Sequence, residues 1–332
     1  AMFVLAISAY YMLKKRDLPF ARRSFAIASS FGLASILSVI VLGDESGYEI
    51  GEVQKVKLAA IEAEWETHEP PAAFTLFGIP DQENMETDYA IKIPYALGLI
   101  ATRSVTEEVK GLKDLIAEHE IKIRNGIVAY DLLTQIKAGD RSEATIAEFR
   151  SRVDDLGYGL LLKKYVENPV NATEEQIKLA AQNSIPRVAP MFWTFRIMVG
   201  LGFIMLVLIG LSFYYSAKGT AERQKYLLRA LIIALPAPWI ACEMGWFVAE
   251  FGRQPWSIGG ILPTHLSVST RSVEDIYMSL AGFIGFYTLL LIAEMYLMIR
   301  FARLGPSSLH TGRYHWEQTG ENDSASTSPA QA

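Results

Sequence analysis

Long apolar runs dominate the pattern of hydrophobic and polar positions along this chain. Four of them are long enough to cross a bilayer: residues 24–42, 188–215, 227–248 and 276–299. A hydrocarbon core of about 30 Å takes roughly 20 helical residues, and backbone groups in lipid have no water to bond. We therefore expect an all-α fold, a multi-pass transmembrane helical bundle.

A fifth apolar run, residues 1–13, is too short to span a membrane alone. A signal peptide carries its positive charge before the apolar run, whereas Lys14, Lys15 and Arg16 follow this one. Because residue 1 is Ala, we interpret the run as part of a transmembrane helix and expect a further N-terminal portion in the natural protein.

Basic residues mark one side of the predicted bundle. They gather between residues 13 and 24, between 215 and 227, and after 299. By the positive-inside rule these three regions are cytoplasmic. The connections at 43–187 and 251–275 are then exoplasmic, which in a bacterium means periplasmic. Residues 300–332 are expected to form a cytoplasmic tail, which is polar from Pro306 and predicted to be disordered.

The connection at 43–187 is the largest polar segment. Helical periodicity around 53–65, 106–138 and 143–156 favours a folded exoplasmic loop domain. The segment opens with the polar, turn-forming run Gly43–Tyr48. Lys57 and Glu62 are five residues apart, so they do not share one narrow helical face. From pattern alone, a solvated helix surface is the simpler interpretation of both.

The composition limits the kinds of metal and redox site that this chain can form. The chain is 51% hydrophobic, with a mean hydropathy of +0.19, which agrees with a membrane protein. Its single cysteine, Cys242, excludes an intrachain disulfide and a paired-cysteine iron–sulfur or zinc site. None of the five histidines lies in an apolar run, so histidine ligands for a membrane haem would have to come from the expected N-terminal portion.

Charged groups at membrane depth are functional candidates by default. Glu243, Trp246, Glu250 and Arg253 step by three, four and three residues, which places them on one helical face. The alternative for the last two charges is an ion pair at the helix end. A transporter or channel is an alternative function, in which Glu243, Glu250 and Arg253 line an ion pathway, although broken-helix repeats are not evident. A structural or assembly subunit is a further alternative.

Two prolines, and an arginine close to a methionine, also stand out within the apolar runs. Pro236 and Pro238 remove backbone donors, so a bend is expected near them. Arg196 and Met198 lie near the exoplasmic start of the run at 188–215. Methionine in an apolar helix is usually core filler, and the rarer alternative is a thioether ligand to haem iron. Arg196 would then suit a haem propionate.

Several motifs are more specific than these patterns. The run GRQPW at 252–256 follows a span ending in GWFVAE at 245–250, and VQKVKLAAIEAEW occupies 53–65. FRIM lies at 195–198 and FARLGP at 301–306. Together they resemble subunit I of the cytochrome bd quinol oxidases, of the subgroup with an extended quinol loop. The resemblance covers essentially the whole chain.

The resemblance implies a role for several membrane residues. Met198 matches the axial ligand of the low-spin haem b iron, whose partner histidine would lie upstream. Glu250 matches the carboxylate at the high-spin haem b iron, and Arg253 the basic group beside it. Trp246 matches an aromatic residue between the haems. A haem d would complete the set, which the chain could not hold without the expected N-terminal helices.

The resemblance also implies a reaction. Lys57 and Glu62 match residues linked to quinol binding and oxidation, which makes 43–187 the quinol loop. Quinol would be oxidised at the periplasmic side and oxygen reduced to water, giving a proton gradient without a pump. The implied partners are a second oxidase subunit, a small accessory membrane subunit and membrane lipid, and no nucleic acid is expected. The implied location is the bacterial inner membrane.

Overall fold

The computed structural model describes residues 1–304 apart from 68–69, 71, 102 and 105–107, and it describes no side chains for 99–101 and 304. The chain divides into two compact units, residues 1–268 and 269–332. Each unit is described by itself.

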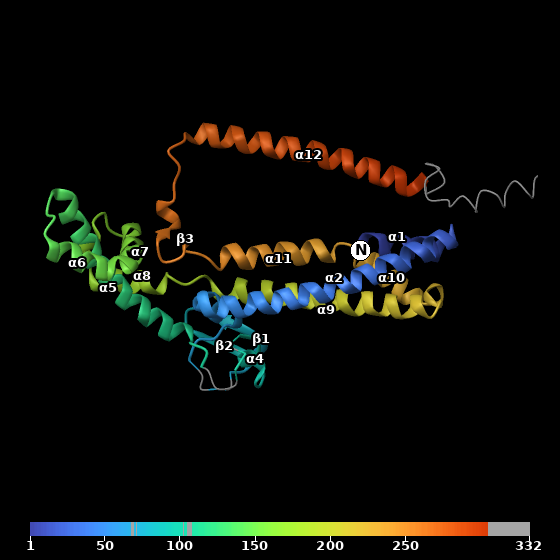
Figure 1. The fold of residues 1–332 in the computed structure, drawn as a ribbon, viewed down its shortest axis with the longest axis horizontal. Coiled ribbons are helices and arrows are strands. Elements are labelled where there is room, and N and C mark those ends of the chain that lie inside the picture. The colour runs from blue at the N-terminus through green and yellow to red at the C-terminus, as the bar shows by residue number, and fades with distance from the viewer. Residues whose placement is uncertain (68–69, 71, 102, 105–107, 305–332) are drawn as a thin grey trace, which may run out of the picture. The chain divides into compact units, whose positions relative to one another are not determined.

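The first unit is built on apolar helices that run alongside one another (Figure 1). They are α1 (Met2–Lys14), α2 (Leu18–Val53), α9 (Val188–Ala217), α10 (Lys225–Ile233) and α11 (Ala237–Phe251). The helix α9 packs against both α2 and α11, and α1 packs against α2 and α10. Leu5, Phe25, Leu228 and Leu231 form the fully buried centre of this packing.

Two of these helices, α2 and α9, are each long and apolar enough to cross a membrane. The helices α10 and α11 meet the same criterion as a pair, bent by 43° at the break between them. This confirms the predicted bend, because Pro236 caps the start of α11 and Pro238 lies in its first turn.

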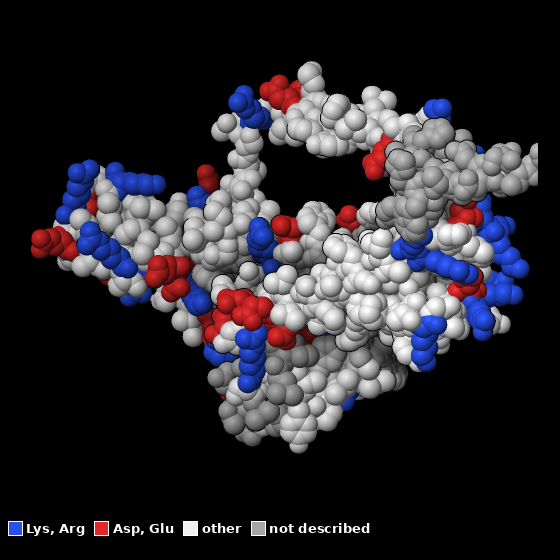
Figure 2. Space-filling view, turned by 45° about the vertical axis from the view of Figure 1, so that its right-hand side comes forward, with Lys and Arg blue, Asp and Glu red and all other residues white. Residues whose placement is uncertain are grey.

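Basic side chains crowd the end of this unit where α1 and α10 lie, and few occur along its middle (Figure 2). They come from the adjoining ends of α1 and α2 and from the stretch between the end of α9 and the start of α10: Lys14, Lys15, Arg16, Arg22, Arg23, Lys218, Arg223 and Lys225. An ion pair between Arg22 of α2 and Glu222 of η4 joins these two regions. This unit thus gathers at one end the charges of two of the three regions from which the cytoplasmic side was predicted.

The helix α2 corrects one expectation. The run Gly43–Tyr48, predicted to form a turn, is helical, because α2 continues unbroken to Val53. No proline interrupts this stretch, and an apolar helix already supplies the nucleus that a new helix would need. Arg103 pairs with Asp44 at 3.2 Å and with Glu45, which ties the extension to the segment between α2 and α9, residues 54–187, called the loop domain below.

The segment between α2 and α9 folds into short helices and a hairpin, with α5 to α8 gathered at one end of the bundle (Figure 1). Its elements are α3 (Lys55–Glu62), β1 (Phe74–Asp81), β2 (Glu86–Ile93), α4 (Ala96–Ala101), α5 (Leu112–Ala138), α6 (Glu143–Arg152), η1 (Val153–Asp155), α7 (Leu156–Leu160), η2 (Leu161–Lys164), η3 (Pro169–Asn171) and α8 (Glu174–Gln182). The three predicted helical stretches are present in shortened form, and residues 106–107 of the second lie outside the described residues.

The hairpin formed by β1 and β2 corrects a second expectation. The fold was predicted to be all-α, but it is mainly helical and contains strands. The strands β1 and β2 pair antiparallel, with Phe74 opposite Ile93 and Asp81 opposite Glu86. The Asp81 side chain closes the turn by accepting hydrogen bonds from the backbone N–H groups of Glu83 and Asn84, at 2.8 and 3.2 Å.

The connection after α11 also belongs to this unit. It holds β3 (Trp256–Ile258), paired antiparallel with β4 (Leu262–Pro263), and the short helix η5 (Thr264–Leu266); η4 (Ala221–Arg223) lies between α9 and α10. Trp256 packs edge-on against Tyr158, with ring centres 5.0 Å apart. The GRQPW segment is therefore held against the loop domain.

The described part of the second unit, residues 269–304, consists mainly of the helix α12 (Val273–Leu304), and all of the helix's described side chains except the half-buried Met298 are exposed. It is long and apolar enough to cross a membrane, in agreement with the span predicted at 276–299. Helix continues through residues 300–304, where the tail was expected to begin. The disorder predicted from Pro306 falls outside the described residues.

Candidate functional site

The short helix α3 places the two loop residues singled out in the sequence. It begins after Gln54 and ends at Ala63, whose φ of 52° and ψ of 41° lie in the left-handed region. Lys57 is 6% exposed and Glu62 is 2% exposed. The solvated-surface interpretation is therefore wrong for both. The prediction failed because α3 packs on α9 and α5, so little of its surface meets solvent.

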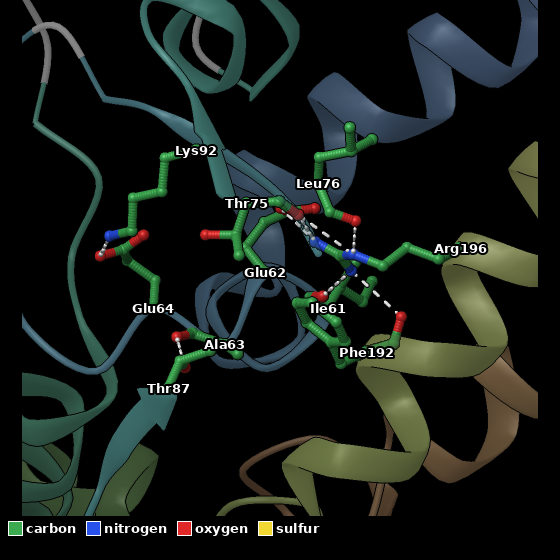
Figure 3. Close-up of polar contacts among 10 residues, drawn as sticks. All are labelled: Ile61, Glu62, Ala63, Glu64, Thr75, Leu76, Thr87, Lys92, Phe192 and Arg196. Carbon is green, nitrogen blue, oxygen red and sulfur yellow. Dashed lines mark hydrogen bonds and ion pairs between the residues drawn. The ribbon is translucent and has the colours of Figure 1, made fainter. Parts of the chain in front are cut away.

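Glu62 forms a buried ion pair with Arg196 of α9, with 3.1 Å between the carboxylate oxygen Oε2 and the guanidinium Nη2. Figure 3 shows the guanidinium surrounded by oxygen atoms from α3, β1 and α9. It donates to the carbonyls of Ile61 at 2.7 Å and Phe192 at 3.1 Å, and also to Thr75 O. One fixed cation thus joins the membrane helix to the loop domain.

The surroundings of Glu62 set its protonation. Burial raises the pKa of the Glu62 carboxyl to about 7, and the charge and hydrogen bond of Arg196 act against that rise. The charge of Glu64 raises the pKa, and a hydrogen bond from the backbone of Thr75 lowers it. A carboxyl with a pKa near neutrality can both accept and release a proton, which suits a general base.

Lys57 lies on another side of α3 and points to the end of α11. Its Nζ donates to the carbonyl oxygen of Ala249 at 3.2 Å. Burial lowers the pKa of the Lys57 ammonium, Arg253 lowers it further and Glu250 raises it. Gly252 permits this contact, because a Cβ there would lie 2.9 Å from Lys57 Cε. The structure therefore brings Lys57 to the segment that carries Glu250 and Arg253.

The predicted polar face of α11 is present and largely open. Glu250 and Arg253 form the expected pair, with 3.5 Å between Oε1 and Nη2. Trp246 is 64% exposed, Glu243 is exposed and Glu250 is partly buried. These residues therefore present carboxylate and aromatic groups outward from the helix pair α9–α11.

Met198 lies on the opposite, packed side of α11. It is partly buried, and a Cβ on Gly245 would lie 3.0 Å from its sulfur. The thioether therefore rests against the glycine backbone at the α9–α11 contact. Met198 of α9 thus contacts α11 at Gly245, whereas Glu250 of α11 lies on the open face of that helix.

Within the described residues, no three His, Cys, Asp or Glu side chains are grouped closely enough to hold a metal ion. A haem does not need such a group, since one or two side chains ligate its iron. Met198 and Glu250 are therefore assessed singly. Each offers an atom that can ligate haem iron: Met198 a thioether in an apolar contact, and Glu250 a carboxylate on an open helix face.

One residue of this site was missed in the sequence. Glu64 is 3% exposed, and its Oε1 lies 3.8 Å from Nζ of Lys92 on β2. Its run of neighbours, Ala-Ala-Ile-Glu-Ala-Glu-Trp, is mostly apolar, which is a signal for burial. The contact between Arg196 and Glu62 had no such signal, since 134 positions separate the two residues.

These features define an α-helical membrane protein with a buried ionisable site where its loop domain meets the helix bundle. Residues 1–306 match the family described as cytochrome bd terminal oxidase subunit I, and the chain belongs to this family.

Two curated relatives are similar in sequence to most of this chain. The chain is 44% identical over 311 residues to cytochrome bd-II ubiquinol oxidase subunit 1 of Escherichia coli (strain K12), covering 94% of this chain and 60% of the relative. It is 29% identical over 306 residues to cytochrome bd ubiquinol oxidase subunit 1 of Bacillus subtilis (strain 168), covering 92% of this chain and 53% of the relative. The chain thus spans a little over half the length of these relatives.

Proposed function

We propose that this chain forms part of a haem-containing respiratory terminal oxidase that oxidises quinol at the periplasmic side of the bacterial inner membrane and reduces oxygen to water. The buried Glu62–Arg196 pair carries this proposal, because it places a proton acceptor with a pKa near neutrality where the loop domain meets the membrane helices. Quinol oxidation releases protons and needs such an acceptor.

The roles of the two loop residues follow from their chemistry. Glu62 accepts a proton from a quinol hydroxyl, and Arg196 fixes the carboxylate in place. Lys57 supplies a buried cation that can donate a hydrogen bond to a quinol oxygen. The residues 43–187 then form the periplasmic quinol loop, and the basic end of the bundle lies at the cytoplasmic side.

The membrane residues fit haem groups, which supply the electron-transfer and oxygen chemistry when bound. Met198 would hold the iron of a low-spin haem b, and Glu250 that of a high-spin haem b with Arg253 and Trp246 beside it. Arg196 was also expected at a haem propionate. Its guanidinium binds Glu62 and backbone carbonyls here, which supports the positioning role above.

The wider assembly is proposed from the same family. A second oxidase subunit and a small accessory subunit would cover apolar helix faces such as that of α12, together with lipid. Haem d is proposed at the oxygen site. A gradient then arises because protons are released on one side and taken up on the other. Membership of this family gives no support to the ion-transporter alternative built on Glu243, Glu250 and Arg253.

The test uses the full-length protein purified with its partner subunit. The preparation is expected to show visible haem absorption, and Met198→Leu is expected to abolish the low-spin haem b signal. A colourless preparation contradicts the oxidase proposal as a whole. A coloured preparation whose low-spin signal survives Met198→Leu contradicts only the ligand assignment.

A further inference from the structure

A proton accepted by Glu62 needs a way out, because Glu62 itself is 2% exposed. Two of the groups that act on its carboxylate cannot take the proton. The guanidinium of Arg196 stays charged, and the backbone N–H of Thr75 only donates. The third is Glu64, whose charge is close enough to raise the pKa of Glu62. Of these three groups, Glu64 is therefore the one that can accept a proton.

Glu64 leads from the buried pair toward solvent. Figure 3 shows Glu62 between Arg196 on one side and the Glu64–Lys92 pair on the other. The Glu64 side chain is 4% exposed, whereas that of Lys92 is 39% exposed. The carboxylate therefore lies just beneath the surface of the loop domain.

A cleft of about 250 Å³ opens at this point. Glu64 and Lys92 line it, together with Glu66, Glu86 and Lys113. It is large enough for several water molecules, which can carry a proton away from a carboxyl group.

The position of Glu64 is fixed by its backbone and its neighbours. Its carbonyl accepts a hydrogen bond from Leu112 N at 2.9 Å, which ties it to the start of α5. Next to it, Trp65 Nε1 donates to Thr87 Oγ1 at 2.9 Å, and Thr87 Oγ1 donates to Ala63 O at 3.2 Å. The segment after α3 is thus held between α5 and β2, as a proton-transfer group requires.

We propose that Glu64 is the relay through which protons leave the quinol site, from Glu62 to Glu64 and then to water in the cleft. The inference rests on the proposed function. Each quinol gives up two electrons and two protons as it becomes quinone, and a bound haem would take up the electrons. When an O–H bond breaks, its proton goes to the Glu62 carboxylate. Transfer to Glu64 restores that carboxylate, and release to water restores Glu64.

The test compares Glu64→Gln with the wild-type enzyme in the intact oxidase, by quinol-dependent oxygen uptake. We expect kcat to fall by about a hundredfold with KM unchanged, since proton transfer by a positioned group typically contributes about that much or more. The solvent deuterium isotope effect on kcat is expected to increase. Added imidazole should restore part of the rate, because the cleft admits a small proton carrier.

Glu118→Gln is the matched control, since Glu118 also pairs with a lysine, Lys110, in the loop domain but lies outside the cleft. It is expected to match the wild type. If Glu64→Gln does not assemble, shown by lost haem absorption, Glu64→Asp is used and is expected to show the same changes to a smaller degree.

The outcomes separate the two proposals. An assembled Glu64 variant with wild-type kcat and isotope effect overturns the relay, provided that Glu62→Gln is impaired. A slow Glu64 variant that imidazole does not rescue also overturns it, because its role is then structural. If Glu62→Gln is unimpaired as well, the quinol site itself is wrongly placed.

Discussion

Replacing Arg196 by glutamine is expected to move the pH dependence of quinol oxidation. The guanidinium lies 3.1 Å from the Glu62 carboxylate and stabilises its ionised form. At an effective dielectric constant of about 20, this attraction is about 5 kcal/mol, or about four pKa units, as an upper limit. Glutamine still donates a hydrogen bond and water can enter, so we expect a rise of about one to two units in the pKa of Glu62.

The pH profile of turnover should move toward higher pH, because Glu62 acts as a base. Glu62 must be ionised to accept a proton, so turnover rises with pH through its pKa of about 7. In Arg196→Gln this rise should begin about one to two pH units higher. At pH 7 the ionised fraction then falls from about one half to about one tenth or less, and turnover falls about fivefold or more.

The assay is quinol-dependent oxygen uptake by the assembled oxidase from pH 5.5 to 9, normalised to low-spin haem absorption. Arg124→Gln is the control, because Arg124 also pairs with carboxylates, Glu120 and Glu174, but on the surface of the loop domain. An Arg196→Gln enzyme with intact haem absorption and an unmoved pH profile refutes the positioning role of Arg196.

Three further substitutions test other parts of the structure. Lys57→Met removes a buried charged hydrogen-bond donor, so KM for quinol should rise about tenfold. An unchanged KM in steady-state assays would show that Lys57 is not part of the quinol site. Gly245→Val places its side chain against the Met198 sulfur, 3.0 Å from the new Cβ, so low-spin haem absorption should decrease or shift; a wild-type spectrum argues against that ligand. Gly126→Ala sets a Cβ 2.3 Å from two backbone atoms and should destabilise the fold by about 3 kcal/mol or more. Gly47→Ala is the control, because a Cβ there meets open space. Equal melting temperatures for the two variants would contradict the close packing at Gly126.

The helix bundle could be predicted from the sequence because lipid imposes a simple rule. Runs of about 20 apolar residues must be helical, and the structure has helices at all the predicted spans. The bend before α11 was also predictable, because proline removes a backbone donor. The extension of α2 to Val53 was not, since glycine and acidic residues are typical of both turns and exposed helix ends.

Neither the β1–β2 hairpin nor the buried Glu62–Arg196 ion pair could be predicted from the sequence in this way. Most residues of β2 are exposed, so the strand lacks the alternation of apolar and polar residues that marks a half-buried strand. The contact between Glu62 and Arg196 joins two distant segments, and no local pattern encodes it. Lys57 and Glu62 entered as candidates through family resemblance, whereas pattern alone assigned them to solvent. In the sequence, a buried polar side chain such as that of Glu62 looks like an exposed one.

The most direct test of the site is the turnover of Glu62→Gln in the assembled oxidase at pH 7.5, expressed per low-spin haem. Glutamine keeps the size of the side chain and can still contact Arg196, but it cannot accept the proton. The proposed site predicts that quinol oxidation falls by about a hundredfold while haem absorption is retained. A Glu62→Gln enzyme with full haem content and wild-type turnover would contradict it.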